Sequence, residues 1–262
     1  MLSGPISART DAIVEWLRER LAESGAAGFV VGLSGGVDSA VAARLCQMAA
    51  PDATIGVVMP CHGEPQDEVD AAALAEHFHL PIVRVDLAPA RDALIGQLDT
   101  AAAGVPTEQR TASRPAEDPR ARVANANLEP RLRMTSLYFL ANTLNYLVAG
   151  TGNRSELAIG YFTKYGDGGV DLLPIGGLLK SEVVAAAREL GVPAAIVDKA
   201  PSAGLWPGQT DEAEFGFSYA ALESYLTRGP EAVAPALAMR IERLIRRSDH
   251  KRVLPPVSET PS

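Results

Sequence analysis

The chain has 262 residues, of which 47% are hydrophobic and 5% aromatic, and its formal charge at pH 7 is −8. An acidic chain binds nucleic acid or an anionic membrane surface poorly, so we expect neither partner. No apolar run reaches the roughly 18 residues that span a bilayer. Two cysteines, Cys46 and Cys61, make no disulfide framework, which predicts a cytoplasmic protein.

Helix-like and strand-like segments alternate in the first part of the chain. Strands are predicted at 28–33, 54–60 and 81–87, and helices at 10–22, 38–49, 66–79 and 89–99. The strands are apolar along their whole length, as burial on both faces of a sheet requires. Short connections between alternating elements are typical of a parallel sheet. The sequence therefore predicts an α/β fold, a doubly wound parallel sheet with helices on both faces.

The alternation stops at residues 100–125, where three prolines stand among Ala, Arg and polar residues. We expect a mobile excursion there, although its alanines can support a helix in part of it. Later elements are predicted as a helix at 127–147, a strand at 147–151, helices at 179–190, 211–226 and 230–247, a Gly/Pro loop at 200–210 and a frayed tail at 256–262. Without a repeat or a clean boundary, the chain is predicted to be one domain over residues 1–262.

The stretch "GLSGGVDSAVAARL" at 32–45 stands where the first predicted strand turns into a helix. Backbone N–H groups at a helix start, together with the helix dipole, favour a bound anion. Gly35 and Gly36 let the backbone approach a ligand, and the hydroxyls of Ser34 and Ser39 add hydrogen-bond donors. This loop is predicted to hold phosphate.

Asp38 distinguishes the loop from the GxxxxGK[ST] loop of common nucleotide triphosphatases, which has a lysine instead. A carboxylate repels phosphates unless a cation lies between them, so Asp38 indicates Mg²⁺ carried on a polyphosphate. The alternative is an ordinary turn in which Asp38 caps the next helix.

A second motif, "GTGNRSE" at 150–156, follows the predicted strand at 147–151. Its Glu156 can point into the same cleft as Asp38, and two carboxylates from separate segments make a candidate Mg²⁺ site. The alternative is a capping box in which Asn153 and Glu156 exchange hydrogen bonds at a helix start.

A glycine-rich stretch, "TKYGDGGVD" at 163–171, offers further polar groups. Such a loop beside a strand edge is typical of a segment that covers a ligand. Lys164 can pair with a substrate carboxylate, and Asp171 can accept a hydrogen bond from a sugar hydroxyl or a ring substituent. The alternative is a solvated hairpin.

The segment S-G-G-V-D-S at 34–39 resembles the loop of the N-type ATP pyrophosphatases, which cleave ATP between the α and β phosphates on a Rossmann-like fold. Over about residues 10–255 the chain resembles the ammonia-dependent NAD synthetases. The resemblance is carried by Asn127 and Arg131, GTGNRSE at 150–156, YFTKYGDGG at 161–169, Asp171, Lys180, PSAGLWPGQTDE at 201–212 and DHKR at 249–252.

The resemblance implies a ligase that forms a carbon–nitrogen bond: deamido-NAD⁺, ATP and ammonia give NAD⁺, AMP and pyrophosphate. It implies that Asp38 and Glu156 hold Mg²⁺ and that Asp38 and Lys180 are catalytic. ATP is expected to contact Gly32, Leu33, Ser34, Gly35, Gly36, Val37, Asp38, Ser39, Thr151, Lys180 and Ser202. Deamido-NAD⁺ is expected to contact Arg131, Lys164, Asp171, His250 and Lys251.

Two of these assignments agree with local geometry. Arg131 lies four residues after Asn127 and so shares its helix face, whereas Arg133 points elsewhere; the alternative makes Arg131 a surface charge. Lys180 stands at a predicted helix start, where the dipole disfavours a cation, so a ligand is expected at this position; the alternative is that Ser181 offsets the cost as a helix cap. Some bacterial members of the family carry Thr where Ser202 stands, and the hydroxyl is kept.

Ammonia is the expected nitrogen source, because the glutaminase domain that many NAD synthetases carry needs roughly 250 further residues. A separate amidotransferase partner stays open. Cys61, in "MPCHGE", is expected to be a neutral thiol rather than a nucleophile.

A homodimer is the expected assembly, because the family forms homodimers. Trp16, Leu17, Leu21 and the apolar positions in 134–147 also exceed what one side of a compact sheet needs. Ordinary core packing is the competing explanation.

Two other functions compete with this one. A tRNA-thiolating enzyme of the same loop family would need a basic face and catalytic cysteines, which the charge of −8 and the two cysteines disfavour. A non-catalytic nucleotide sensor would need the glycine loop but has no use for Asp38, Glu156 and Lys180 together.

Overall fold

Four parallel strands form one sheet in the computed structural model, which describes residues 5–106, 108, 119–201 and 210–258. Across the sheet the strand order is β3-β2-β1-β4, and every neighbouring pair runs parallel. The strands are β1 Gly28–Leu33, β2 Thr54–Val58, β3 Ile82–Arg84 and β4 Tyr146–Ala149. The predicted parallel sheet is confirmed, and each of the four predicted strands belongs to it.

Helices account for most of the remaining described chain. They are α1 Ile6–Ser24, α2 Val37–Ala49, α3 Pro65–Phe78, α4 Ala88–Ala103, α5 Pro119–Ala126, α6 Leu128–Leu144, α7 Arg154–Ile159, α8 Lys180–Glu189, α9 Ala194–Val197, α10 Asp211–Phe215, α11 Tyr219–Arg228 and α12 Pro235–Ser248. Two 3-10 turns, η1 Pro230–Ala232 and η2 Asp249–Lys251, lie on either side of α12.

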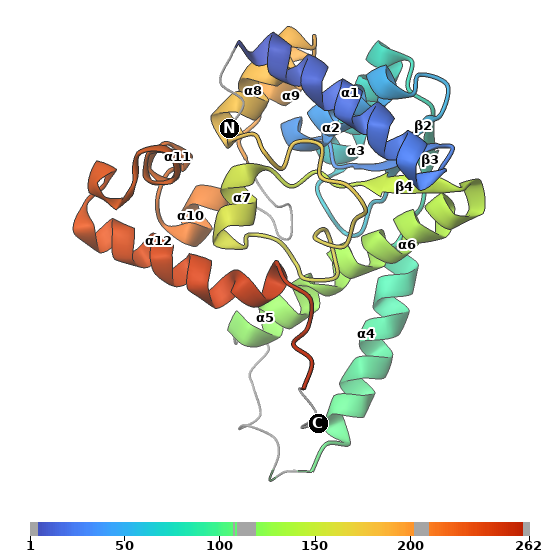
Figure 1. The fold of residues 1–262 in the computed structure, drawn as a ribbon. Coiled ribbons are helices and arrows are strands. Elements are labelled where there is room, and N and C mark those ends of the chain that lie inside the picture. Colours follow the sequence, from blue (N-terminus) through green and yellow to red (C-terminus); the bar gives the residue numbers. More distant parts are fainter. Residues whose placement is uncertain (1–4, 107, 109–118, 202–209, 259–262) are drawn as a thin grey trace.

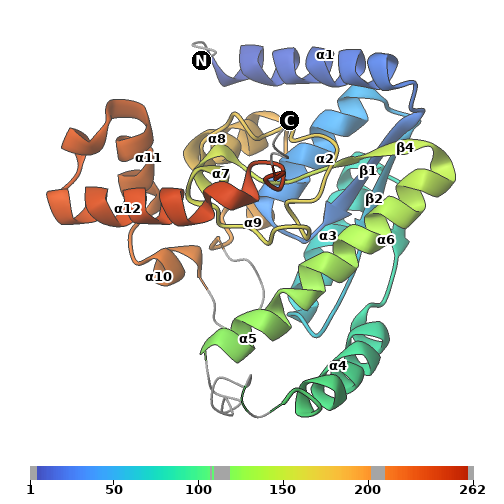
Figure 2. The ribbon, with the colours of Figure 1, turned by 60° about the horizontal axis from the view of Figure 1, so that its bottom comes forward.

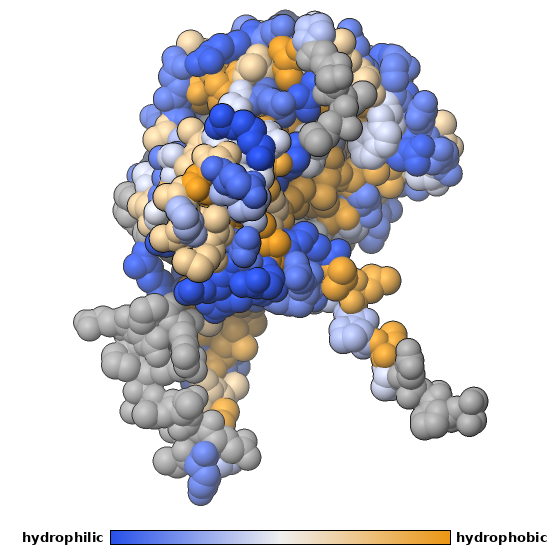
Figure 3. Space-filling model, turned by 60° about the vertical axis from the view of Figure 1, so that its left-hand side comes forward, coloured by the Kyte–Doolittle hydropathy of each residue, from blue (hydrophilic) through white to orange (hydrophobic). Residues whose placement is uncertain are grey.

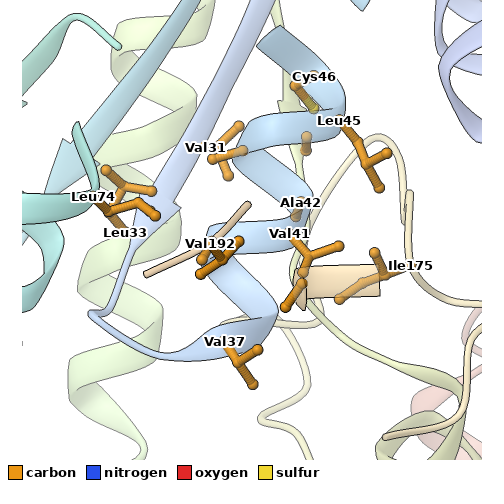
Figure 4. Packing of buried hydrophobic residues seen from close by; sticks show 14 of the residues in the cluster. Val31, Leu33, Val37, Val41, Ala42, Leu45, Cys46, Leu74, Ile175 and Val192 are labelled. Carbon is orange, nitrogen blue, oxygen red and sulfur yellow. The ribbon is translucent and has the colours of Figure 1, made fainter. Parts of the chain in front are cut away.

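Helices cover both faces of the sheet, as a doubly wound fold requires (Figure 1, Figure 2). On one face α2 packs against β1, with α1 and α8 outside it, and on the other face α6 packs against β1 and β4. Side chains of β1 alternate between the two cores: Phe29, Val31 and Leu33 pack with α2, and Val30 packs with α6. Figure 4 shows apolar side chains around α2, so this helix is buried on several sides.

The winding of the sheet reverses at β1. From β1 the chain proceeds to β2 and β3 on one side, and it later returns through α6 to β4 on the other side. Ligands of open parallel sheets bind outside the carboxyl ends of the strands at such a reversal. The turns after β1 and β4, at 34–36 and 150–153, leave the sheet at this edge. The fold therefore brings the two sequence motifs to one place.

The predicted C-terminal helices are wrong as single elements. The helix predicted at 211–226 is divided into α10 and α11, because Gly216 takes a left-handed conformation (φ 74°) that ends α10. The helix predicted at 230–247 starts as a 3-10 turn, and α12 begins only at Pro235. Together with α7 these helices enclose a separate small core, whose fully buried members are Leu222 and Ile241.

Two boundaries differ in the middle of the chain. The helix predicted at 127–147 is α6, and it ends earlier because Asn145 takes a left-handed conformation (φ 56°) before β4 begins. Residues 154–159 form α7, a short helix whose start was predicted only as the capping-box alternative.

The predicted excursion at 100–125 is helical at both ends, since α4 runs to Ala103 and α5 begins at Pro119. Residues 107 and 109–118 lie outside the described residues, and the mobility of the excursion stays a prediction. Of the predicted tail at 256–262, the described residues up to 258 are exposed and form no helix or strand.

Among the described residues no helix combines the length and apolar character that crossing a membrane needs. Figure 3 shows a face with hydrophilic residues (blue) along its top and lower edge and a broad apolar area (orange and tan) between them. Leu17 is fully buried and Leu21 packs on the same core, so core packing explains these two. Trp16 and Phe139, by contrast, are 36% and 71% exposed.

Candidate active site

The turn between β1 and α2 is shaped by its own hydroxyl groups. The Ser34 N–H donates to Ser39 Oγ at 3.2 Å, and Ser39 Oγ donates to the Gly36 carbonyl at 2.9 Å. Gly35 has a φ of 73°, and a Cβ there would lie 2.4 Å from the carbonyl oxygen of Asp67 in α3. Only glycine fits at position 35 of this turn. The predicted strand–turn–helix is confirmed.

Asp38 stands in the first turn of α2 but does not cap it. Within the described residues no side chain caps α2, so the alternative that makes Asp38 a helix cap is wrong. Asp38 Oδ1 instead accepts from Asn153 Nδ2 at 2.9 Å, and Oδ2 accepts from Lys180 Nζ. The first N–H groups of α2 are therefore left for a ligand.

Glu156 uses its two oxygens differently. Asn153 Oδ1 accepts from the Glu156 N–H at 3.0 Å, and Glu156 Oε2 accepts from the Asn153 N–H at 3.2 Å. The capping box is thus confirmed at the start of α7. The other oxygen, Oε1, lies 4.0 Å from Lys180 Nζ and accepts from the Tyr219 hydroxyl at 3.4 Å. One carboxylate therefore fixes a helix start and also faces the cluster around Asp38.

Lys180 is the first residue of α8, and it is buried. Its backbone N–H donates to Ser155 Oγ at 3.2 Å, which fixes the helix start beside α7. Burial alone would lower the pKa of Lys180, but the carboxylates of Asp38 and Glu156 outweigh that effect and raise it. Lys180 is therefore a charged ammonium, and the two carboxylates offset the cost of a cation at a helix N-terminus.

Two members of this cluster, Asp211 and Tyr219, were missed by sequence reasoning. The Tyr219 hydroxyl donates to Asp211 Oδ2 at 2.8 Å, and its ring centroid lies 5.5 Å from Lys180 Nζ. Burial raises the pKa of Asp211. Asp211 belongs to the quoted stretch "PSAGLWPGQTDE", which could have singled it out, whereas nothing in its local sequence distinguishes Tyr219 from a packing residue.

The cluster has more negative than positive charge, since three carboxylates share one ammonium. Among the described residues no three His, Cys, Asp or Glu side chains are arranged as a metal site. A Mg²⁺ that arrives on a polyphosphate needs few ligands from the protein. Burial raises the pKa of Glu156 well above its usual value, and the nearby carboxylate of Asp38 raises it further. A cation between the two carboxylates would offset this unfavourable negative charge. Asp38 and Glu156 therefore fit a magnesium–nucleotide substrate.

Three of the five residues expected to contact deamido-NAD⁺ lie together. Lys164 Nζ donates to the His250 carbonyl oxygen, and the Arg131 guanidinium donates to the Lys164 carbonyl oxygen at 3.4 Å. Arg133 instead donates to the Met59 carbonyl oxygen at 3.3 Å. The prediction that Arg131 and Arg133 point to different places is confirmed.

The other two, Lys251 and Asp171, hold backbone in place. Lys251 Nζ donates to two carbonyl oxygens of the loop that begins at Gly160, at 2.7 and 2.6 Å. Asp171 accepts from the Tyr138 hydroxyl at 3.0 Å and from a backbone N–H of β4 at 2.8 Å. Their contact with a substrate stays a prediction.

Thr151 stands in the turn between β4 and α7, half-buried. Ser202 lies outside the described residues. Cys61 is buried, and burial raises the pKa of its thiol, as expected for a neutral side chain.

A glycine turn and two carboxylates at the reversal of a parallel sheet define the class of the protein: it has the ATP pyrophosphatase fold. A family model described as NAD synthase matches residues 9–255, and the chain belongs to this family. The expectation drawn from the sequence motifs is thereby confirmed.

Two relatives are similar to this chain over nearly their whole length. An NH(3)-dependent NAD(+) synthetase of Carboxydothermus hydrogenoformans is 49% identical, with 95% of this chain and 96% of the relative covered. The protein of the same name from Archaeoglobus fulgidus is 43% identical, with 95% of both chains covered.

Two solved structures are similar over nearly the whole chain. The structure of NMN synthetase from Francisella tularensis has a TM-score of 0.86 at 35% identity and covers 98% of this chain and 100% of that one. NH3-dependent NAD synthetase from Campylobacter jejuni, in complex with the nitrate ion, has a TM-score of 0.76 at 27% identity and covers 98% and 100%.

Proposed function

We propose that this protein is an ammonia-dependent NAD synthetase, a ligase that converts deamido-NAD⁺, ATP and ammonia into NAD⁺, AMP and pyrophosphate. The observation that carries the proposal is the meeting of Asp38, Glu156 and Lys180 beside the Gly35 turn. This site joins an anion-binding turn to a place for a cation, as the cleavage of a magnesium–ATP complex requires.

The nicotinate carboxylate is a poor electrophile, because direct attack on it must expel oxide. One of its oxygens attacks the α phosphorus of ATP, and the bond to pyrophosphate breaks. Ammonia then attacks the acyl carbon, AMP leaves with the carboxylate oxygen, and a proton is released. No nucleophilic side chain is needed, so the protein positions the reactants and neutralises charge.

Lys180, Asp38, Glu156 and Asn153 each have a task in this reaction. The N–H groups of the turn and the Lys180 ammonium stabilise the departing pyrophosphate. Asp38 and Glu156 would hold the Mg²⁺ of the nucleotide, which would supply positive charge at the phosphates. Asn153 keeps the Asp38 carboxylate in place through the 2.9 Å hydrogen bond.

The deamido-NAD⁺ site is proposed at Arg131, Lys164 and His250. Arg131 and Lys164 supply positive charge, and their hydrogen bonds to the backbone carbonyls of Lys164 and His250 keep the three residues close to one another. Asp171 and Lys251 are proposed as further contacts of deamido-NAD⁺. Thr151 and Ser202 complete the proposed ATP contacts.

We further propose a cytoplasmic homodimer. Trp16 and Phe139 leave apolar surface for a second copy of the chain. Sedimentation of the purified protein at two concentrations tests this assembly, and a monomer at both would contradict it.

An end-point assay tests the function. Purified protein receives Mg-ATP, deamido-NAD⁺ and either ammonium or glutamine, and NAD⁺ and AMP are measured. We expect NAD⁺ with ammonium and little with glutamine; equal yields would contradict the nitrogen source, and no NAD⁺ with either would contradict the function. Asp38→Asn should abolish AMP formation, whereas a nucleotide sensor would have no turnover to lose.

A second candidate substrate is nicotinic acid mononucleotide, favoured by the similarity to the NMN synthetase structure. Both substrates present the same nicotinate carboxylate, and only deamido-NAD⁺ carries an adenylate half. The ratio of kcat/KM for the two substrates in competition decides which one the protein uses.

A further inference from the structure

Lys199 connects α3 with the segment that follows α9. Its Nζ donates to Asp67 Oδ1 at 2.8 Å and to Asp70 Oδ2 at 2.5 Å. Asp70 Oδ1 also accepts from Gln66 Nε2 at 2.8 Å, so this carboxylate is held from two sides. One lysine thus bridges two acidic residues of a helix that is 129 or more positions away in the sequence.

The same part of α3 supports the phosphate turn. A Cβ on Gly35 would lie 2.4 Å from the carbonyl oxygen of Asp67 and 3.0 Å from its Cα. The turn therefore packs directly on the backbone of the residue whose side chain Lys199 holds. Because interiors are close-packed, a displacement of Asp67 changes the space available to the turn.

The segment after Lys199 is tied to the acidic cluster. The Pro201 carbonyl accepts from the Asp211 N–H at 3.3 Å. The Asp211 carboxylate accepts from the Tyr219 hydroxyl, which also donates to Glu156. The backbone from Lys199 to Pro201 thus lies between α3, which supports the turn, and the carboxylates at the proposed cation site.

We propose that Lys199 is a positioning residue for ATP, acting through Asp67 on the conformation of the Gly35 turn. The proposal rests on the proposed function and adds a residue that has no contact with the cluster of Asp38, Glu156 and Lys180. The side chains of Lys199, Asp67 and Asp70 are 31%, 35% and 12% exposed. Ion pairs of this exposure contribute little to global stability, so their loss should act mainly on the turn.

The test is a kinetic comparison of Lys199→Met with wild type. We expect KM for Mg-ATP to rise roughly fivefold, the scale of a partly exposed ion pair. The inhibition constant of pyrophosphate should rise by a similar factor, because the turn holds the same phosphates. The KM for deamido-NAD⁺ and kcat should stay within about twofold. Lys199→Arg, which keeps the charge, should restore most of the ATP affinity.

Asp198→Asn is the matched control. Asp198 is the neighbouring residue, and its pair with Arg188, at 3.4 Å, is exposed by 70% and 64% and does not touch α3. The KM of the Asp198→Asn variant for Mg-ATP should equal that of wild type. In the double variant of Lys199→Met and Asp70→Asn the two effects should be less than additive, because both remove one interaction.

The outcomes separate this proposal from the proposed function. If the wild-type protein formed no NAD⁺, the proposed function would be contradicted. Calorimetric titration of ATP into wild type and Lys199→Met would then still test whether Lys199 positions the turn for ATP. Active wild type with an unchanged KM for Mg-ATP in Lys199→Met would overturn the proposal. A lowered Tm with an unchanged KM would assign Lys199 a structural role only.

Discussion

Lys180 Nζ donates a hydrogen bond to Oδ2 of Asp38 across 142 positions of the sequence, and it joins the first residue of α8 to the first turn of α2. Each residue stands at a helix N-terminus, where the dipole favours the carboxylate and disfavours the ammonium. The helix dipole therefore stabilises the Asp38 carboxylate, whereas the Lys180 ammonium is stabilised by its acidic neighbours against the dipole of its own helix. Phosphate groups in the turn would give Lys180 a second set of partners.

Replacing Lys180 should separate binding from chemistry. Lys180→Met removes a cation that stabilises the leaving pyrophosphate, so AMP formation should fall by about 10²-fold or more. Lys180→Arg should recover little, because a planar guanidinium does not fit a buried site built for a compact ammonium. The measurement is AMP release at saturating substrates, with circular dichroism to verify folding. The control is Arg188→Met, an exposed cation on the same helix; equal activity in both variants would contradict a role for Lys180.

Glu156 can be tested with its cap left intact. Glutamine at the third helix position still closes a capping box, so Glu156→Gln should keep the start of α7. Because burial raises the pKa of Glu156, its charge costs stability at neutral pH, and the uncharged variant should melt at or above the wild-type Tm. Its AMP formation should fall strongly, and more Mg²⁺ should be needed for half-maximal rate.

Glu156→Ala provides the comparison. It loses the cap as well as the charge and should be less stable than Glu156→Gln by about 1 kcal/mol in urea unfolding. Wild-type turnover in Glu156→Gln would mean that the carboxylate serves the helix alone.

The sheet and the glycine turn between β1 and α2 could be predicted because their signals are local. An apolar run followed by glycines and then by helical spacing specifies β1, the turn and α2 without reference to the rest of the chain. The motif around Asn153 and Glu156 was located for the same reason. Its capping box is present in the structure, and Glu156 Oε1 faces Lys180 and Tyr219, while the Mg²⁺ site stays a prediction.

The remaining site residues depend on contacts between distant segments. Tyr219 reaches Asp211 and Glu156 only because Gly216 ends α10 and turns the chain back into α11. Lys199 contacts Asp67 of α3 across 132 positions of the sequence, so the contact exists only once the domain has folded. In the sequence both look like ordinary helix or loop residues, so no local pattern reveals them.

Asn153 has two functions that a pair of variants can separate. Its side-chain oxygen caps α7, and its amide nitrogen donates to Asp38. Asn153→Ser keeps a good capping oxygen but lacks the amide donor, so stability should change little while the rate of AMP formation drops. Asn153→Ala should also lose about 1 kcal/mol of unfolding free energy. Urea unfolding and AMP release are measured for both; equal rates in Asn153→Ser and wild type would show that Asp38 needs no help from Asn153.

Gly35 should not tolerate any side chain, whereas Gly36 should. Alanine at 35 requires a left-handed conformation and places its Cβ 2.4 Å from the Asp67 carbonyl, which is backbone and cannot move aside cheaply. We expect Gly35→Ala to lose at least about 1 kcal/mol of unfolding free energy and most of its ATP affinity. At Gly36, φ is −99° and a Cβ meets only Ser34 Oγ, at 3.4 Å, so Gly36→Ala should unfold like wild type. Urea unfolding and ATP titration measure both effects. If the two variants proved equally stable, the contact between the turn and α3 would not constrain the site.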